Sequence, residues 1–462
     1  MSASVLPNSV LPNGPLVAFY GDDYTGSSAA MEALAFAGLP TILFLEPPTP
    51  QRLAAAAHFH GIGIAGTARS QSNPWMEQNL PSIFRTLAAI GAPFSHYKTC
   101  STFDSAPHIG SIGRAADLAI PLLGGQWHPM IVASPAMGRY QAFGHLFATV
   151  DGTGYRLDRH PTMSRHPVTP MDEADLGRHL ARQTSRTIGL VDFVTMAAGH
   201  ADAALMKQIV SGAEIISIDV LDRKTLEQAG RLMWDHRGER LFAVGSQGVE
   251  QALVAHWQAV GLIETPDRPA GFAAVDRMAG ISGSCSPVTS EQISYAEKTG
   301  FEIIRVDATR AVAASAWQNE IDRSARIALD ALSAGRDPLL VTARGADDPA
   351  IAALRTAVET SGSSLEQVNA RIGSGLGQAL NLILAAAKLR RVVVAGGDTS
   401  GHAVKELNMY ALSAIAPLAS GAPLCLAASE VPAFAIEIVL KGGQVGQTDL
   451  FRVARDGHSV QV

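Results

Sequence analysis

Cysteine is scarce in this chain, with three residues among 462: Cys100, Cys285 and Cys425. They lie far apart and match none of the short spacings that zinc sites use. Secreted disulfide scaffolds are much denser in cysteine. The scarcity therefore argues against a disulfide framework and a structural metal site, and it favours a reducing, cytoplasmic compartment.

Basic clusters and long apolar runs are also lacking. The formal net charge is −6, and no block of lysine and arginine residues suggests a face for nucleic acid. No segment offers about 18 consecutive uncharged apolar residues, the length that suggests a membrane-spanning helix. We therefore expect neither nucleic acid nor a membrane as a partner, and the sequence leaves a homo-oligomer open.

Two common nucleotide-binding fingerprints are absent. A dinucleotide-binding turn needs GxGxxG directly after a strand, whereas Gly373, Gly375 and Gly377 follow no predicted strand and have another spacing. A P-loop would need Lys and then Ser or Thr where His402 and Ala403 stand. These absences argue against a dehydrogenase and against a Walker A nucleotide site.

What the chain does contain is a strand, a turn and a helix in succession, in both of its halves. Near the C-terminus, residues 392–394 form a β-branched apolar run, and a turn over 396–401, Gly-Gly-Asp-Thr-Ser-Gly, precedes a helical pattern that begins at His402. Glycines let the backbone approach a ligand closely, and the free N–H groups of a first helical turn suit phosphate. The alternative is an ordinary tight connection between a strand and a helix.

The N-terminal half begins with the same design. An apolar strand over Leu16–Tyr20 runs into Asp22 and Asp23, and an alanine-rich helix over Ser27–Phe36 follows. Open α/β sheets place their ligands at the carboxyl ends of the strands, so this position favours chemistry for the two carboxylates. The alternative is that one aspartate caps the helix, and both roles are compatible.

Further polar residues follow the next predicted strands. Arg69 comes after a strand over 61–66, and Lys98 lies in a segment that begins as a strand at Phe94 and continues into hydroxyl-bearing residues. An arginine at the same edge could grip a carboxylate with two hydrogen bonds, although a surface arginine is the commoner case. Such a cluster of a cation and hydroxyls suits polyols and acids.

Turns with small residues recur in the C-terminal half. Residues 280–289 form a serine-rich turn before a helix that begins near Ser290, and the strand over 435–440 delivers Lys441, Gly442 and Gly443. Hydroxyls at a helix start and a glycine turn that carries a lysine suit phosphate or ribose oxygens.

Strands and helices alternate along the chain, which predicts an α/β protein with parallel sheets. We expect two domains at 1–262 and 280–462, each a largely parallel sheet flanked by helices, joined by a linker at 263–279. Residues 149–170 show no clear period and are expected to form a long loop or a short hairpin over the sheet. Their histidines match no metal-ligand spacing. A long apolar helix is expected to open with residues 371–377.

Together these motifs resemble the four-carbon acid sugar kinase family, once known only as a domain of unknown function. The resemblance spans nearly the whole chain and rests on five motifs in order. They are Asp-Asp-Tyr-Thr-Gly at 22–26, Lys98 with Ser101 and Thr102, Gly-Ser-Cys-Ser-Pro-Val-Thr at 283–289, Gly-Gly-Asp-Thr-Ser at 396–400 and Lys-Gly-Gly-Gln-Val-Gly at 441–446. It implies ATP-dependent phosphorylation of a terminal hydroxyl on a small sugar acid, in a cleft between an acceptor-binding and a nucleotide-binding domain.

The resemblance also implies residue roles. Asp22 or Asp23 would accept the hydroxyl proton. The acceptor would be bound by five residues: Thr25, Arg69, Lys98, Ser101 and Thr102. ATP would be held by the three turns through Ser282, Ser284, Ser286, Gly396, Gly397, Asp398, Thr399, Ser400, Lys441, Gly442 and Gly443. Mg²⁺ would be carried mostly by the phosphates, with no dedicated metal site in the protein.

The acceptor loop departs from the pattern of the family. Members usually read Lys-x-Asp-Ser-Thr-Leu-Arg-Gly, whereas Cys100 replaces the aspartate here and Phe-Asp-Ser at 103–105 replaces Leu-Arg-Gly. An altered pocket favours a branched or oxidised acid such as 3-oxo-isoapionate, phosphorylated to its 4-phosphate in carbohydrate catabolism. The alternatives are a threonate or erythronate kinase, a loop that lies outside the pocket, and a non-enzymatic sugar-acid binder.

Overall fold

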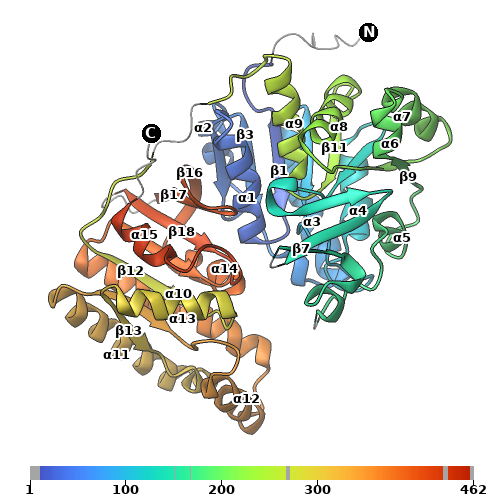
Figure 1. The fold of residues 1–462 in the computed structure, drawn as a ribbon. Coiled ribbons are helices and arrows are strands. Elements are labelled where there is room, and N and C mark those ends of the chain that lie inside the picture. Colours follow the sequence, from blue (N-terminus) through green and yellow to red (C-terminus); the bar gives the residue numbers. More distant parts are fainter. Residues whose placement is uncertain (1–10, 151, 167, 267–270, 430–434, 458–462) are drawn as a thin grey trace. The chain divides into compact units, whose positions relative to one another are not determined.

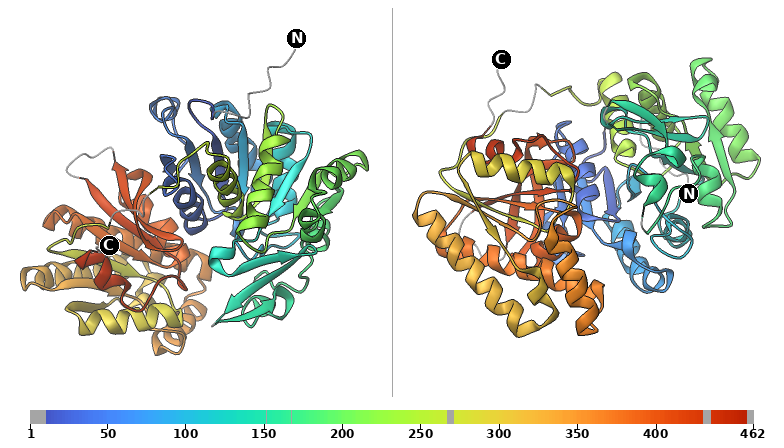
Figure 2. Two further views of the ribbon diagram at one scale, coloured as in Figure 1. Left: turned by 45° about the horizontal axis from the view of Figure 1, so that its top comes forward. Right: turned by 60° about the horizontal axis from the view of Figure 1, so that its bottom comes forward.

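The computed structural model describes residues 11–150, 152–166, 168–266, 271–429 and 435–457. The chain divides into two compact units, Met1–Pro266 and Asp267–Val462. Each unit is built on its own run of strands and helices (Figures 1 and 2). The two-domain α/β class predicted from the alternating pattern is confirmed.

Among the residues described, the first unit is organised around eight parallel strands in the order β2-β3-β1-β4-β11-β5-β10-β9. These strands are β1 (Val17–Gly21), β2 (Thr41–Phe44), β3 (Gly61–Ala65), β4 (Phe94–Lys98), β5 (His128–Ile131), β9 (Ile188–Val191), β10 (Ile215–Ile218) and β11 (Leu241–Gly245). The two middle strands, β4 and β11, and their neighbour β1 are buried along their whole length. Continuous apolar runs such as that of β1 are typical of a parallel sheet covered on both faces.

Nine helices accompany this sheet among the described residues. They are α1 (Tyr24–Ala35), α2 (Pro50–Ala55), α3 (Asn73–Ile90), α4 (Ile112–Leu123), α5 (Leu176–Ala181), α6 (Phe193–Ala197), α7 (Ala201–Val210), α8 (Arg223–Asp235) and α9 (Gly248–Ala259). Helix α3 packs against α4, and α9 packs against both α1 and α8. A hydrophobic core of the unit lies under α3 and α4, where Phe84 meets Tyr20 and Tyr97 of the sheet.

A separate antiparallel sheet, here called the hairpin arm, is formed by β6 (Arg139–Ala142), β7 (His145–Val150) and β8 (Thr153–Arg156). It is anchored at the end of β10, because the carboxylate of Asp219 accepts the backbone N–H groups of Phe143 and Gly144 at 2.5 and 2.9 Å. The arm includes the hairpin that was one of the two alternatives predicted for residues 149–170. It extends further toward the N-terminus than the sequence indicated.

In its described part, the second unit has seven strands in the order β13-β14-β12-β15-β18-β17-β16. They are β12 (Met278–Ser282), β13 (Phe301–Arg305), β14 (Asp337–Val341), β15 (Arg391–Ala395), β16 (Met409–Ala419), β17 (Ala422–Ser429) and β18 (Ile436–Lys441). The first five in spatial order are parallel, whereas β17 runs antiparallel to β18 and β16. The sequence did not reveal β16 and β17. Strand β12 begins at Met278, inside the segment that was expected to be a linker.

Those helices of the second unit whose starts the sequence predicted begin earlier than expected. They are α10 (Pro287–Lys298), α11 (Ala314–Ser333), α12 (Pro349–Ser361), α13 (Leu365–Ala387), α14 (Gly397–Glu406) and α15 (Leu450–Asp456). Helix α10 starts after a Ser286 cap, and α14 starts at Gly397, so the predicted starts at 290 and 402 are wrong. In both cases residues that look like a loop in sequence form the first helical turn. The side chain of Ser286 caps α10, whereas Gly396 at the N-cap of α14 makes no side-chain cap bond.

The glycines at 373, 375 and 377 lie inside α13 and do not open it. A Cβ atom at Gly375 would lie 2.2 Å from Nε1 of Trp317 on α11, and one at Gly377 would lie 2.7 Å from the backbone of Ala403 on α14. The glycines therefore allow neighbouring helices to approach α13 closely, which explains a series that matches no nucleotide fingerprint.

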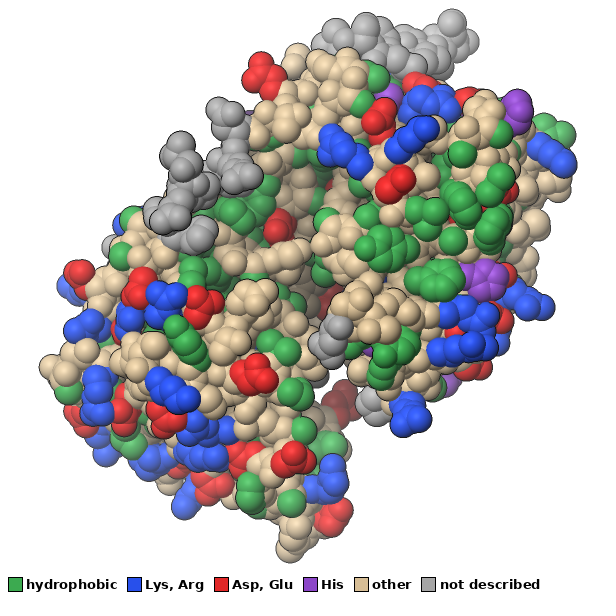
Figure 3. All heavy atoms as spheres, viewed as in Figure 1, with side chains coloured by type: hydrophobic (Ala, Val, Ile, Leu, Met, Phe, Trp, Pro, Cys, Tyr) green, Lys and Arg blue, Asp and Glu red, His purple; other side chains and the backbone are tan. Residues whose placement is uncertain are grey.

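Charged side chains of both signs are interspersed on the face of the molecule that Figure 3 shows, with no large area of one sign. Within the described residues, none of the helices combines the length and the apolar composition that crossing a membrane requires.

Candidate active site

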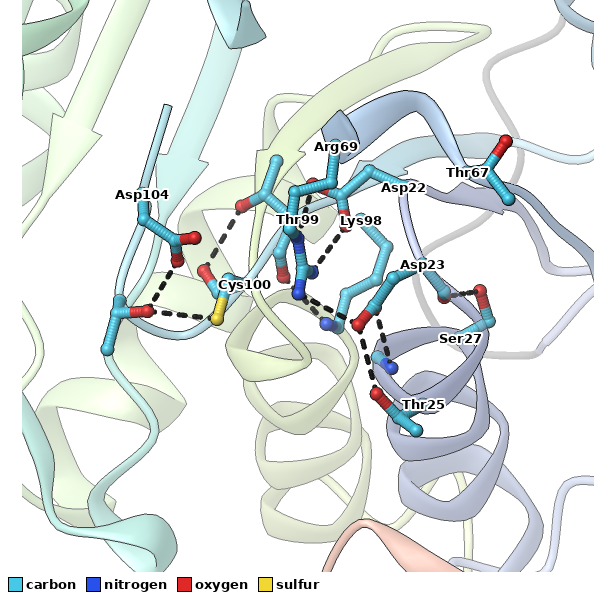
Figure 4. A network of polar contacts seen from close by, with 12 residues as sticks. Asp22, Asp23, Thr25, Ser27, Thr67, Arg69, Lys98, Thr99, Cys100 and Asp104 are labelled. Carbon is cyan, nitrogen blue, oxygen red and sulfur yellow. Dashed lines mark hydrogen bonds and ion pairs between the residues drawn. The ribbon is translucent and has the colours of Figure 1, made fainter. Parts of the chain in front are cut away.

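Four polar residues of the first unit meet at the carboxyl edge of its sheet. Asp22 and Asp23 directly follow β1, Arg69 lies in a short 3₁₀ turn after β3, and Lys98 is the last residue of β4. The register explains the meeting, because Gly21 pairs with the last residues of both β3 and β4. Figure 4 shows the four side chains pointing toward one another. The structure therefore brings together the acceptor residues expected from separate motifs.

Arg69 joins the two aspartates. Its Nη2 and Nε donate to the carboxylate of Asp22 at 2.6 and 3.3 Å, and its Nη1 donates to Oδ2 of Asp23 at 2.8 Å. Burial lowers the pKa of Arg69, but the two carboxylates outweigh this effect and raise that pKa well above its ordinary value. The positive charge of Arg69 is thus already compensated within the protein.

The two aspartates occupy different environments. The side chain of Asp22 is 2% exposed and that of Asp23 is 26% exposed. Burial raises the pKa of Asp22 to about 6, although Arg69 acts in the opposite direction. Asp23 is the N-cap of α1, with Oδ1 accepting the N–H of Gly26 at 2.8 Å. One of the two aspartates is therefore a helix cap, as the alternative interpretation of the sequence had it.

Lys98 and Thr25 complete the cluster. The ammonium group of Lys98 is buried and donates to the backbone oxygen of Thr99 at 2.6 Å. A Cβ atom at Gly26 would lie 2.9 Å from Nζ of Lys98, so a larger residue at position 26 would crowd the lysine. Thr25 donates its hydroxyl to Oδ2 of Asp23 at 2.9 Å. Both residues therefore belong to the cluster, and the hydrogen bonds described for them are made to other residues of the protein.

The loop after β4 joins the predicted Thr102 to two residues, Cys100 and Asp104, that the sequence argument did not assign to the site. Thr102 Oγ1 lies 2.9 Å from Sγ of Cys100 and donates to Oδ1 of Asp104 at 2.6 Å. Burial would raise the pKa of Asp104, but Arg69 and the hydrogen bond from Thr102 hold it below its ordinary value. The carboxylate of Asp104 is therefore a third one that interacts with Arg69, after those of Asp22 and Asp23. The departure of this loop from the family pattern was the signal that could have indicated Asp104. Ser101 in the same loop is half-buried.

In the second unit, β12, β15 and β18 are adjacent in the sheet and deliver the three predicted turns at their carboxyl ends. Ser282 ends β12, Gly396 follows β15 and Lys441 ends β18. Gly396 has a φ of 118°, which other residues rarely adopt, and this conformation turns the chain directly into α14. The turns expected to hold ATP therefore lie side by side within this unit.

Most of the hydroxyls in these turns bond to the protein. Ser286 and Thr289 donate to the carbonyl oxygen of Gly443, the latter at 2.8 Å, and Ser400 donates to the carbonyl oxygen of Gly396 at 2.7 Å. Ser284 accepts the N–H of Ser286 at 3.2 Å. These hydroxyls fix the shape of the turns and leave backbone groups to meet a ligand.

Lys441 lies beneath the turns and is fully buried. Its Nζ donates to Oγ1 of Thr289 at 2.8 Å, and no carboxylate of the described residues forms an ion pair with it. Burial lowers the pKa of Lys441 to about 8. A buried ammonium group without a counterion is suited to an anionic ligand.

Gly397 is the most open glycine of the three turns. It is exposed, and a Cβ atom there would meet no protein atom within 4 Å. By contrast, a Cβ atom at Gly283 would lie 2.2 Å from Oγ1 of Thr399, so that glycine is needed for packing. Gly442 is half-buried, and the side chain of Asp398 lies outside the described part of the structure.

Comparison with protein families divides the chain in the same way. Residues 17–253 match the model of a sugar-binding N-terminal domain, and residues 279–451 match the model of a nucleotide-binding C-terminal domain. The chain is 46% identical to the 3-oxo-isoapionate kinase of Paraburkholderia graminis over 96% of this chain and 95% of that protein. It is 32% identical to the 3-oxo-tetronate kinase of Methylobacterium radiotolerans over 94% of this chain and 97% of that protein.

Solved structures support the fold. A Salmonella typhimurium protein described as a putative tRNA synthase aligns with a TM-score of 0.76 at 23% identity, covering 95% of this chain and 98% of its own. A Haemophilus influenzae protein aligns with a TM-score of 0.71 at 22% identity over the same shares of the two chains. At this identity the likeness shows the fold alone.

Proposed function

The chain belongs to the four-carbon acid sugar kinase family, and from this premise we propose that it transfers the γ-phosphoryl group of ATP to a hydroxyl group of 3-oxo-isoapionate, giving the 4-phosphate. The family membership makes it a sugar-acid kinase, and its relatives with kinase names do not favour the alternative of a non-enzymatic binder. The choice of acid is the proposal.

One observation carries the choice of acid. The identity with the 3-oxo-isoapionate kinase is far higher than the identity with the 3-oxo-tetronate kinases, although both kinds of relative match almost the whole chain. The acceptor loop supports the same choice, because Cys100 and Asp104 replace the aspartate and the arginine of the family pattern, and Thr102 links them into a polar chain beside Arg69.

Asp22 is the residue we propose as the acceptor of the hydroxyl proton. Phosphoryl transfer needs in-line positioning and charge compensation more than covalent help from the protein, and a base with a pKa near the working pH assists the attacking hydroxyl. Asp22 has the raised pKa, whereas Asp23 caps α1 and shares Arg69. Arg69 would hold the two carboxylates in place and limit the spread of negative charge at the edge.

ATP is proposed to lie on the turns of the second unit, with its phosphates near Gly397 and Gly443. The exposed glycine at the start of α14 and the buried ammonium group of Lys441 fit an anionic ligand. Mg²⁺ compensates phosphate charge when it is bound with ATP. The described residues contain no group of three or more His, Cys, Asp or Glu side chains arranged around a metal, so we assign Mg²⁺ mainly to the phosphates. The prediction of a shared cleft rests on the requirement that hydroxyl and phosphate meet in line.

The test is a comparison of kcat/KM for 3-oxo-isoapionate, D-threonate, L-threonate and D-erythronate, measured as ADP release from ATP. We expect the highest value with 3-oxo-isoapionate. A clear preference for one of the linear four-carbon acids would refute the choice of acid and leave the kinase assignment intact. Absence of acceptor-dependent turnover across a broad panel of sugar acids would contradict the kinase itself.

A further inference from the structure

Arg139 is an arginine of the first unit that no sequence motif indicated. It begins β6 of the hairpin arm, and its backbone forms an antiparallel bridge with Ser134, just beyond the carboxyl end of β5. The N–H of Arg139 donates to the oxygen of Ser134 at 3.1 Å, and the N–H of Ser134 donates back at 3.0 Å. The backbone of Arg139 is therefore fixed at the same sheet edge as Asp22 and Lys98.

The guanidinium group of Arg139 is incompletely satisfied. Its Nη1 donates to the backbone oxygens of Met137, Gly138 and Thr149 at 3.0, 3.3 and 3.3 Å. Its Nε is buried and has no hydrogen-bond partner. No carboxylate among the described residues forms an ion pair with Arg139, whereas Arg69 has two. Arg139 thus keeps its positive charge uncompensated.

The strand order brings Arg139 to the side of the sheet edge that carries the acceptor loop. Burial lowers the pKa of Arg139, and only the thiolate form of Cys100 opposes this effect. Cys100 itself interacts with Asp104 and Arg69. The strand order β1-β4-β11-β5 puts two strand spacings, about 10 Å, between β4 and β5 at this edge. The side chain of Arg139 is long enough to cross part of that distance.

We propose that Arg139 binds the carboxylate of the sugar acid, in the role that the sequence argument gave to Arg69. The two arginines differ in whether their positive charge is already compensated within the protein, and this difference favours Arg139. Arg69 is neutralised by Asp22 and Asp23, and the approach of a third carboxylate would add repulsion. Arg139 is partly exposed, uncompensated and able to offer a planar pair of N–H groups, which matches a carboxylate. The acid would then extend from its reacting hydroxyl near Asp22 toward the hairpin arm.

This inference rests on the proposed function, and its test uses the full-length enzyme with ATP. Arg139→Gln should raise the KM for the acid by roughly 10- to 100-fold, the range expected for losing hydrogen bonds to a charged group, with a small change in kcat and none in the KM for ATP. A matched control is Arg159→Gln, which removes an exposed arginine near the end of the hairpin arm and should leave all three constants unchanged.

A structural role in the turn at Gly138 would also weaken the enzyme, so a second readout is needed. The carboxamide of the same acid keeps its shape and loses its charge. The wild type should prefer the acid to the amide, and Arg139→Gln should largely lose this preference, which a merely loosened arm would retain. If Arg139→Gln does not fold by thermal melting, Arg139→Lys keeps the charge without the planar fork and should still raise the KM for the acid.

The outcomes separate the two claims. An active wild type together with an Arg139→Gln variant that keeps the preference for the acid overturns the role of Arg139 and leaves the kinase untouched. If Arg139→Gln does not fold, an unchanged KM in Arg139→Lys also overturns it. Absence of turnover of any sugar acid by the wild type would instead count against the proposed function.

Discussion

The two sheet edges of this protein handle charge in opposite ways. At the edge of the first unit, Arg69 is clamped between Asp22 and Asp23, and further polar residues of the acceptor loop adjoin it. The edge of the second unit is made of glycine turns, hydroxyls bonded to backbone, and the buried Lys441 without a carboxylate partner among the described residues.

The difference fits two different ligands. A small acid with several hydroxyls needs groups that discriminate between them and a base, so a network of compensated charges suits it. The phosphates of a nucleotide need close backbone approach and little side-chain chemistry, which glycine turns and the start of a helix supply. The comparison predicts that substitutions at the first edge reduce turnover, whereas those at the second edge weaken nucleotide binding.

The largest expected effect is at Asp22. Asp22→Asn should lower kcat roughly 10²-fold or more, because a positioned base contributes about that factor. Asp23→Asn should cost less, since asparagine caps a helix nearly as well as aspartate. Steady-state kinetics of both variants at saturating ATP distinguish base from cap. Near-wild-type turnover in both would show that the proposed site at this edge is wrong.

The next effect is at Gly397. Gly397→Val should raise the KM for ATP at least about tenfold, or about 1.4 kcal/mol, because a side chain would occupy the space that phosphate needs. The substitution meets no protein atom within 4 Å, so the fold should tolerate it. Gly154→Val, at an equally open glycine of the hairpin arm, is the matched control and should leave the KM for ATP unchanged. If Gly397→Val and Gly154→Val raised the KM for ATP equally, Gly397 would have no special role in nucleotide binding.

The pH dependence of kcat/KM and of the stability should test the role of Asp22 at the first edge. The pKa of Asp22 is raised to about 6 by burial, so a base at this position is lost by protonation as the pH falls. The value of kcat/KM should drop about tenfold between pH 7 and pH 5. The pH dependence of the stability has the opposite sign. A carboxyl with a raised folded-state pKa favours folding at low pH, and this contribution is lost as the pH rises toward 6. Rates and melting temperatures measured at the same pH values check both signs, and a flat rate profile would exclude Asp22.

The smallest expected effect is at Lys441. Burial lowers its pKa to about 8, so its charge is lost as the pH rises through that value. The affinity for ATP should therefore weaken a few-fold between pH 7 and pH 9, because an ammonium group attracts phosphate and an amine does not. Lys441→Met should remove this pH dependence while keeping the bulk of the side chain. An identical pH dependence in the variant would place its origin elsewhere.

Much of this arrangement could be predicted from the sequence. The β-branched run before Gly396 and the apolar run before Asp22 indicated buried parallel strands, and the carboxyl ends of such strands share one edge. The meeting of Arg69 with the aspartates followed from the same rule. The motif order indicated the family, which the comparisons with known proteins confirm.

Other features depend on contacts between distant residues, which periodicity does not reveal. The starts of α10 and α14 were placed too late, because Ser286 and Gly396 serve as caps within segments that look like loops. The strands β16 and β17 lacked a clear pattern, and the glycines of α13 have their reason in Trp317 and Ala403. Arg139 was not indicated, because its position depends on the pairing of the hairpin arm with Ser134.

The most direct test of the division between the two edges is a crossed binding measurement by titration calorimetry. A nonhydrolysable ATP analogue and 3-oxo-isoapionate are each titrated into the wild type, Asp22→Asn and Gly397→Val. We predict that Gly397→Val loses affinity for the nucleotide and binds the acid as the wild type does, while Asp22→Asn binds the nucleotide normally. Gly397→Val that weakens both ligands equally, or Asp22→Asn that loses the nucleotide, would contradict the account.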